Sequence, residues 1–151
     1  MDFKIYKKSI QLSWVEPNYF VKEDYIYDSL LPDILNEFKL INISKTPNQK
    51  LKCIKKIKEY IISLIQFNEG IDKKIGADDI FPVLNYIFIQ AHPLNIFTDL
   101  EFIKIFLVNN KNKEYNILQI ESIYKLILNY TPENFNLTKE EFDKRSIKSA
   151  Q

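Results

Sequence analysis

Glycine is nearly absent from this chain of 151 residues, which contains only Gly70 and Gly76. β-rich folds and phosphate-binding loops rely on glycine where the backbone turns tightly, so two glycines suit neither. No Walker motif or dinucleotide-binding fingerprint occurs, which argues against most nucleotide-binding enzymes. The composition therefore favours an all-α fold, and the length suits one domain with a sizeable core.

The segment 76–93 predicts the central helix of this fold. Two carboxylates, Asp78 and Asp79, precede the run 80–89, whose apolar residues fall on nearly every helical face. A helix of this kind is buried, yet its acidic first turn has to reach the surface. Pro82 follows the first of the two acids by four residues.

Apolar spacing and capping signals predict about six helices, packed as a compact layered bundle. The strongest start is Thr46, where Pro47 fits the first turn and Gln49 completes a capping box. The helices are expected at 27–38, 46–68, 78–91, 98–108 and 116–128, with a short last helix opening at Thr138.

The domain organisation expected from this pattern has three parts. Residues 1–23 are expected to form an extended N-terminal arm packed on the body. Residues 24–145 form the helical domain, in which no internal repeat and no linker is visible. Residues 146–151 are expected to be a flexible tail that is frayed at the chain end.

Charge and cysteine content argue against several classes of function. The net charge is +1 and the charges are interspersed, so the one-sided basic stripe of a nucleic-acid-binding protein is missing. The lone Cys53 points to a reducing compartment, and the N-terminus lacks the apolar core of a signal peptide. The uncharged run 80–98 is broken by His92 and Pro93, so we interpret it as soluble core rather than a membrane span.

The candidate chemical residues allow more than one interpretation. Asp78 and Asp79 can cap the helix, or can present a carboxylate to a cationic or phosphate-binding partner. Neighbouring helical residues diverge by roughly 100°, so they do not form a catalytic acid pair, and no further metal ligands are spaced to join them. His92 is expected to cap the central helix, Cys53 to lie in the core, and Tyr115 either to pin a loop or to anchor a partner. These residues alone indicate an interaction surface and no reaction.

Several segments together resemble the Vps-nine domain, the catalytic module of guanine nucleotide exchange factors for endosomal Rab GTPases. The similarity runs over roughly residues 11–145, and its most specific part is the motif ADDxxPVL. The segments that carry it are 11–15 (QLSWV), 46–54 (TPNQKLKCI), 76–86 (GADDIFPVLNY), 90–93 (QAHP), 114–115 (EY), 120–122 (IES) and 135–142 (FNLTKEEF, similar to Rabex-type members).

The resemblance implies a layered all-α exchange domain whose substrate is a Rab GTPase, the Rab-five subfamily being favoured. Asp78 would be the catalytic aspartate finger that reaches the phosphate-binding loop, and Asp79 its neighbour. Pro82 would help to form the groove, while Tyr115 and Leu118 would contact the partner. No metal or other cofactor is implied, and the protein is expected to be a cytoplasmic monomer recruited to early endosomes for endocytosis and vesicle-mediated transport.

The chain departs from the family pattern at three positions. His92 replaces an asparagine, Asn116 stands for a second tyrosine, and Leu118 stands where a threonine is usual. An alternative therefore stays open, in which the domain is a catalytically inactive scaffold that binds a Rab. An unrelated enzyme is the third hypothesis, disfavoured because the chain lacks a nucleophile with a matching base.

Overall fold

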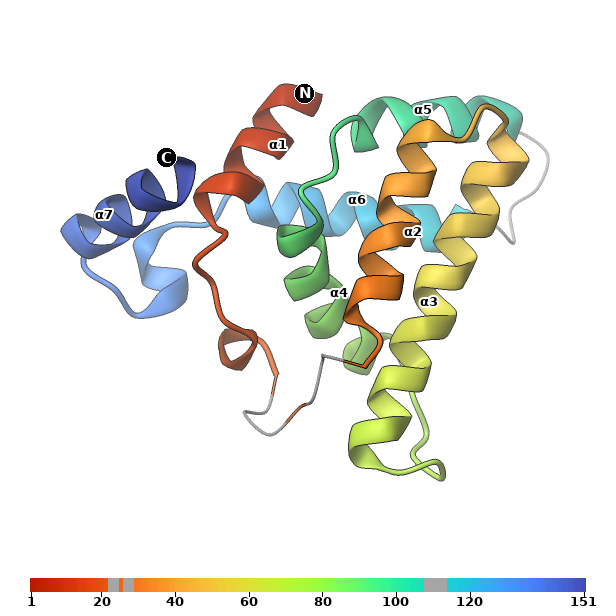
Figure 1. The fold of residues 1–151 in the computed structure, drawn as a ribbon, viewed down its shortest axis with the longest axis horizontal. Helices are drawn as coiled ribbons and strands as arrows, with labels where there is room; N and C mark the ends of the chain where they lie inside the picture. The colour runs from red at the N-terminus through yellow and green to blue at the C-terminus, as the bar shows by residue number, and fades with distance from the viewer. Residues whose placement is uncertain (22–24, 26–28, 108–113) are drawn as a thin grey trace.

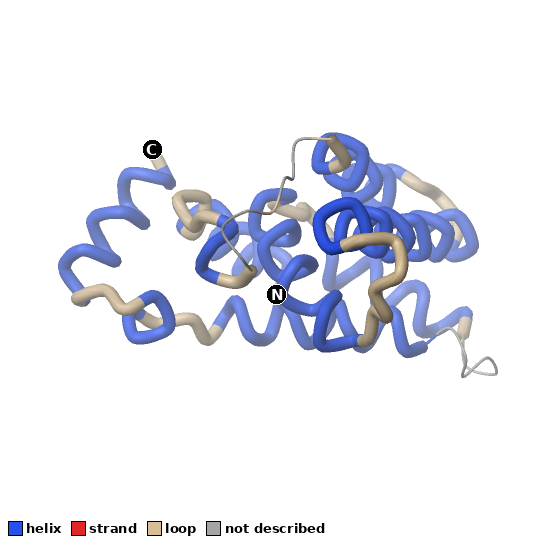
Figure 2. Tube along the Cα trace, turned by 90° about the horizontal axis from the view of Figure 1, so that it is seen from below, coloured by secondary structure: helices blue, strands red, loops and turns tan. Residues whose placement is uncertain are grey.

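The computed structural model describes residues 1–21, 25, 29–107 and 114–151. These residues form seven α-helices and two short 3₁₀ helices with no strand among them, which confirms the predicted all-α class (Figure 2). Two predicted boundaries lie outside the described residues: the start of one helix at Tyr27 and the end of another at Val108. The elements are α1 (Asp2–Gln11), η1 (Pro17–Tyr19), α2 (Leu31–Ile43), α3 (Pro47–Glu69), α4 (Ala77–Ala91), α5 (Ile96–Phe106), α6 (Glu114–Leu128), η3 (Pro132–Phe135) and α7 (Lys139–Ala150).

The helix α4 lies at the centre and packs against α1, α2, α3 and α6. The helices α2 and α3 lie side by side as a hairpin, and α6 crosses them (Figure 1). Three consecutive residues of α4, Ile87, Phe88 and Ile89, are fully buried. Neighbours on all sides are needed to bury three successive helical positions, so the predicted central helix is confirmed.

Two of the predicted capping signals are confirmed. Thr46 Oγ1 accepts a hydrogen bond from the backbone N–H of Gln49 at 3.2 Å, and Gln49 Oε1 accepts one from Thr46 N–H at 3.3 Å. Thr138 Oγ1 likewise accepts from Glu141 N–H at 3.2 Å to start α7. The end of α7 differs from the prediction, because the helix continues beyond Lys144 to Ala150.

The predicted extended conformation of the N-terminal segment is wrong, because residues 2–11 form the helix α1. Ile5, Ser9 and Leu12 are fully buried, and their spacing of four and then three residues places them on one helical face. The apolar period is hidden in the sequence because the middle position of this face is a serine. Ser9 fits there because its hydroxyl donates a hydrogen bond to the Tyr6 carbonyl oxygen at 2.7 Å.

The same helix determines where α5 begins. Asp2 Oδ1 accepts hydrogen bonds from the backbone N–H groups of Phe97 (2.8 Å) and Thr98 (3.2 Å). These are among the N–H groups that a helix leaves unpaired in its first turn. The helix α5 therefore begins at Ile96 instead of the predicted Thr98, with a carboxylate from the far end of the chain as its cap.

The two ends of the chain meet in an aromatic cluster. The Trp14 ring makes edge-to-face contacts with Tyr19, Phe135 and Phe142, at centroid separations of 5.9, 5.2 and 5.9 Å. The helix α7 packs against α1 beside this cluster. Such rings contribute both buried area and favourable pair geometry, so they attach α7 to the body.

Candidate functional site

Asp78 and Asp79, the two acids in the first turn of α4, have different surroundings. The carboxylate of Asp79 accepts a hydrogen bond from the backbone N–H of Gly76 at 2.9 Å, which closes the helix start. Lys73 Nζ lies 3.4 Å from the same carboxylate. The backbone hydrogen bond, followed by the charge of Lys73, holds the pKa of Asp79 below its usual range. Asp79 is therefore the capping residue.

Asp78 is left free by this arrangement. Its side chain is exposed at the second position of α4, and none of the described residues forms a hydrogen bond or ion pair with its carboxylate. The negative charge is compatible with the positive end of the helix dipole, so the site tolerates it without a partner. A free carboxylate at a fixed helical position is available to a second molecule.

A depression of about 240 Å³ lies beside Asp78, between the first turn of α4 and the first half of α6. Tyr115 is 50% exposed and Leu118 is 48% exposed, so two large apolar side chains face solvent here. The residues that line the depression are Ala77, Asp78, Phe81, Tyr115, Leu118, Gln119 and Ser122. Exposed aromatic and aliphatic groups around a single charge are typical of a protein-binding surface.

Helical spacing explains why these side chains meet. Asp78 and Phe81 are three residues apart on α4, so they share one face. Tyr115, Leu118 and Ser122 follow the same rule on α6, together with Gln119. Packing of α4 against α6 brings the two faces together.

The predicted site residues do not all lie at the depression. Asp78, Tyr115 and Leu118 line it, whereas Asp79 and Pro82 do not. Pro82 is half-buried within α4 and has no N–H, so the carbonyl oxygen of Asp78 receives no hydrogen bond from it. The structural connection of Pro82 to Asp78 is therefore this missing backbone hydrogen bond, and not a shared place at the depression.

Phe81, Gln119 and Ser122 also line the depression, although they were not predicted as site residues from the sequence. Their spacing from Asp78 and Tyr115 is the signal that could have found them, once both segments were read as helices. Lys58 is likewise not predicted by the sequence, because it is one of several lysines along α3 and no local pattern sets it apart. Its ammonium lies 5.5 Å from the centre of the Tyr115 ring.

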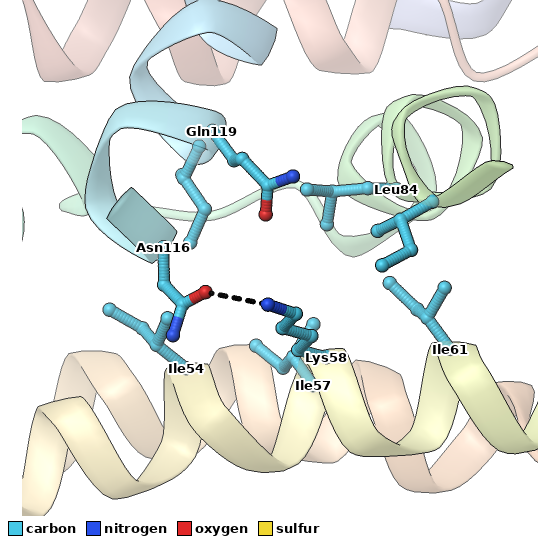
Figure 3. A pocket seen from close by; sticks show the side chains of 9 residues that line it. Ile54, Ile57, Lys58, Ile61, Leu84, Asn116 and Gln119 are labelled. Carbon is cyan, nitrogen blue, oxygen red and sulfur yellow. Dashed lines mark hydrogen bonds between the residues drawn. The ribbon is translucent and has the colours of Figure 1, made fainter. Parts of the chain in front are cut away.

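A narrow apolar seam lies next to the depression, where α3 packs against α4 and α6 (Figure 3). Its volume is about 10 Å³, which is no more than a single water molecule needs. Gln119 borders both the seam and the depression. At the edge of the seam, Lys58 Nζ donates a hydrogen bond to Asn116 Oδ1 at 3.4 Å. The seam is a packing contact, and the open depression is the candidate binding surface.

His92 and Cys53 lie where the sequence places them. His92 ends α4 in the left-handed conformation, with φ 46°, and its ring nitrogens lie 3.2 Å from Ser9 Oγ and 3.3 Å from Ser13 Oγ. Burial lowers the pKa of His92. Cys53 is buried in the core, where burial raises the pKa of its thiol. The described part of the chain contains no group of three histidine, cysteine or acidic side chains that could hold a metal ion.

Comparison with known proteins identifies the fold around this depression. The family model of the Vacuolar sorting protein 9 (VPS9) domain matches residues 31–132, which include α2 to α6 and every residue lining the depression. This chain belongs to the VPS9 domain family. The helices α1 and α7 lie outside the matched part of the VPS9 domain.

Three relatives illustrate the similarity. Human "GTPase-activating protein and VPS9 domain-containing protein 1" is 32% identical over 87 residues, which are 57% of this chain and 6% of that protein. Rice (Oryza sativa subsp. japonica) "Vacuolar protein sorting-associated protein 9A" is 27% identical over 146 residues, covering 92% of this chain and 30% of the relative. Human "Rab5 GDP/GTP exchange factor" is 24% identical over 152 residues, covering 95% and 30%. The chain thus spans less than a third of the length of each of these relatives.

Within the described ranges, no helix combines the length and the apolar character that crossing a bilayer requires.

Proposed function

We propose that this VPS9 domain is a guanine nucleotide exchange factor for a small GTPase of the Rab family, with the Rab5 subfamily as the favoured substrate. The observation that carries the proposal is the exposed carboxylate of Asp78, which lies beside the apolar depression and has no partner among the residues that the structure describes. A human relative that aligns over 95% of the chain is named an exchange factor for Rab5, which supports the choice of substrate.

The proposed mechanism uses the charge of Asp78. In a GTPase, the lysine and the backbone N–H groups of the phosphate-binding loop hold the nucleotide phosphates, while a serine or threonine of the loop and an aspartate hold the Mg²⁺. A carboxylate brought to this loop pairs with the lysine, competes with the β-phosphate and disfavours Mg²⁺. GDP affinity then falls, and GTP from solution refills the site. No covalent step and no cofactor is needed, because the catalyst binds the nucleotide-free form best.

The other site residues have supporting roles in the proposal. Tyr115 and Leu118 supply the apolar contact area for the switch regions of the GTPase. Asp79 fixes the first turn of α4 through its bond to Gly76, so that Asp78 is presented at a defined position. Pro82 has no N–H to donate to the Asp78 carbonyl, and in the proposal this oxygen is a further acceptor for the partner.

The cellular setting follows from the same proposal. The exchange activity belongs to the unit 24–145, and a single copy of the chain carries the whole site. We assign the protein to endocytic, vesicle-mediated traffic, in the cytoplasm and peripheral to early endosomes, where Rab5-type GTPases act. Recruitment to the membrane is assigned to partners rather than to this domain.

Release of fluorescent GDP from a panel of Rab proteins tests the proposal. The wild-type chain is expected to accelerate release from at least one Rab, and Asp78→Asn is expected to lower that rate at least about tenfold, because it removes a charge-assisted contact. Asp72→Asn is the matched control, since Asp72 is an exposed acid in the loop before α4. Equal rates for the two variants would rule out the role of Asp78.

The scaffold alternative is distinguished in the same panel. It is motivated by Leu118, an exposed apolar residue where the family pattern has a threonine, and by Asn116, which stands for a second tyrosine. A Rab that binds the chain without faster GDP release would identify a Rab-binding scaffold instead of an exchange factor.

A further inference from the structure

Lys58 of α3 contacts two residues at the start of α6. Its ammonium lies 5.5 Å from the Tyr115 ring centre and donates a hydrogen bond to Asn116 Oδ1 at 3.4 Å. Figure 3 shows the side chain rising from α3 toward the start of α6. Within the described residues, Lys55, one turn earlier on the same helix, is exposed and has no such partner. Lys58 therefore links α3 to the first turn of α6.

The stem of Lys58 is also held in place. It borders the apolar seam together with Ile54, Ile57 and Ile61 of the same helix. A lysine that packs its methylene groups on apolar surface and keeps its ammonium at the edge has fewer conformations available. The charge is consequently presented at one place, against Tyr115 and Asn116.

Tyr115 needs such a contact if it is to act as an anchor. It is the second residue of α6 and half exposed, so helix packing alone holds only part of its ring. Lys58 is the ring contact that the structure gives it within the described residues. An anchor that is already oriented loses less conformational entropy on binding, which tightens the complex without any new contact.

We infer that Lys58 is a positioning residue, which holds Tyr115 in the orientation that docks the GTPase; this role rests on the proposed exchange function. Lys58 acts through Tyr115, so it influences the docking of the GTPase and leaves the displacement of nucleotide by Asp78 unchanged. The expected change is therefore confined to the GTPase concentration at which GDP release is half-maximal.

The test measures GDP release as a function of GTPase concentration, with the Rab that responds best to the wild type. Lys58→Met keeps the stem and removes the ammonium, and is expected to raise the half-saturating concentration about two- to fivefold at an unchanged maximal rate. Lys58→Arg keeps a cation over the ring and is expected to restore the wild-type value. Lys55→Met is the matched control and is expected to change neither constant.

A double-mutant cycle separates positioning from direct contact with the partner. In a Tyr115→Ala background, Lys58→Met is expected to have no further effect, because the ring it orients is gone. Additive effects would overturn the inference and indicate that Lys58 touches the GTPase itself. Equal behaviour of Lys58→Met and Lys55→Met beside an active wild type would overturn it as well.

Failure of the exchange function is distinguishable from failure of this inference. A wild-type chain that releases GDP from no Rab removes the proposed function and, with it, the docking role of Lys58. The ring contact is tested without any GTPase by the NMR signals of Tyr115, assigned by their loss in Tyr115→Phe. These signals are expected to shift in Lys58→Met and not in Lys55→Met, and unshifted signals would overturn the inference by themselves.

Discussion

The buried ion pair between α3 and α5 is a site where one substitution is expected to change stability strongly. Lys50 Nζ lies 2.8 Å from Asp99 Oδ1 and donates a hydrogen bond to the Ile41 carbonyl oxygen at 2.7 Å. The two charged side chains are only 7% and 9% exposed. Burial raises the pKa of Asp99, whereas the hydrogen bond and the charge of Lys50 oppose that rise. Lys50 thus provides the opposite charge for a carboxyl group that is largely removed from water.

Lys50→Met removes the cation and leaves a buried carboxylate alone. Removal of one partner of a buried pair costs about 3–5 kcal/mol, because the remaining charge is uncompensated. Domains of this size have a total free energy of unfolding of about 5–15 kcal/mol, so the variant is expected to lose a large fraction of it. The deficit should shrink at acidic pH, since protonation of Asp99 removes the unpaired charge.

Urea unfolding followed by fluorescence measures this cost. Trp14 is the single tryptophan and packs among aromatic side chains, so its emission reports unfolding. Lys52→Met is the control, because Lys52 is exposed on the same helix. The double variant Lys50→Met/Asp99→Leu is expected to recover most of the loss, since an apolar pair needs no compensation. A Lys50→Met variant as stable as Lys52→Met would refute the reasoning.

Two further predictions concern polar side chains of α4 and its C-terminal end, the buried Asn85 and the half-buried His92. Burial lowers the pKa of His92, so below about pH 6.5 the unfolded chain takes up a proton more readily than the folded one. The free energy of unfolding is therefore expected to fall from pH 7 to pH 5. The variant His92→Asn should flatten this pH dependence, because asparagine tolerates the left-handed backbone and does not titrate. A pH dependence that is unchanged in His92→Asn would contradict the account. The buried Asn85 donates a hydrogen bond to the Tyr130 hydroxyl. Tyr130→Phe removes this acceptor and is expected to lower the free energy of unfolding, measured by thermal unfolding, by about 1–3 kcal/mol. A loss below experimental error would show that the Asn85 amide has another acceptor.

Local signals in the sequence predicted much of the fold. Thr46 and Gln49 form their capping box because both partners lie within one turn, where tertiary packing has little influence. The central helix was likewise predictable from the apolar run 80–89. The helix α1 was not, because its buried face includes the serine Ser9. The cap of α5 was not, because Asp2 lies 95 positions before Phe97 in the chain.

The candidate site shows the same division between local and long-range information. The sequence places Asp78 and Asp79 at a helix start but does not say which of them caps it. The orientation of the first turn of α4 decides which acid is the cap, because it directs the Asp79 carboxylate toward the backbone N–H of Gly76. The contact of Lys58 with Tyr115 joins residues 57 positions apart and depends on how α3 packs near α6. No local pattern contains that information.

A structure of the chain bound to a nucleotide-free Rab5-type GTPase tests the central claim most directly. The measured quantity is the distance between the Asp78 carboxylate and the lysine ammonium of the phosphate-binding loop. We predict a charge-assisted hydrogen bond of about 2.7–2.9 Å, with Tyr115 and Leu118 against the switch regions. A complex in which Asp78 faces solvent, away from the emptied nucleotide site, would contradict the account.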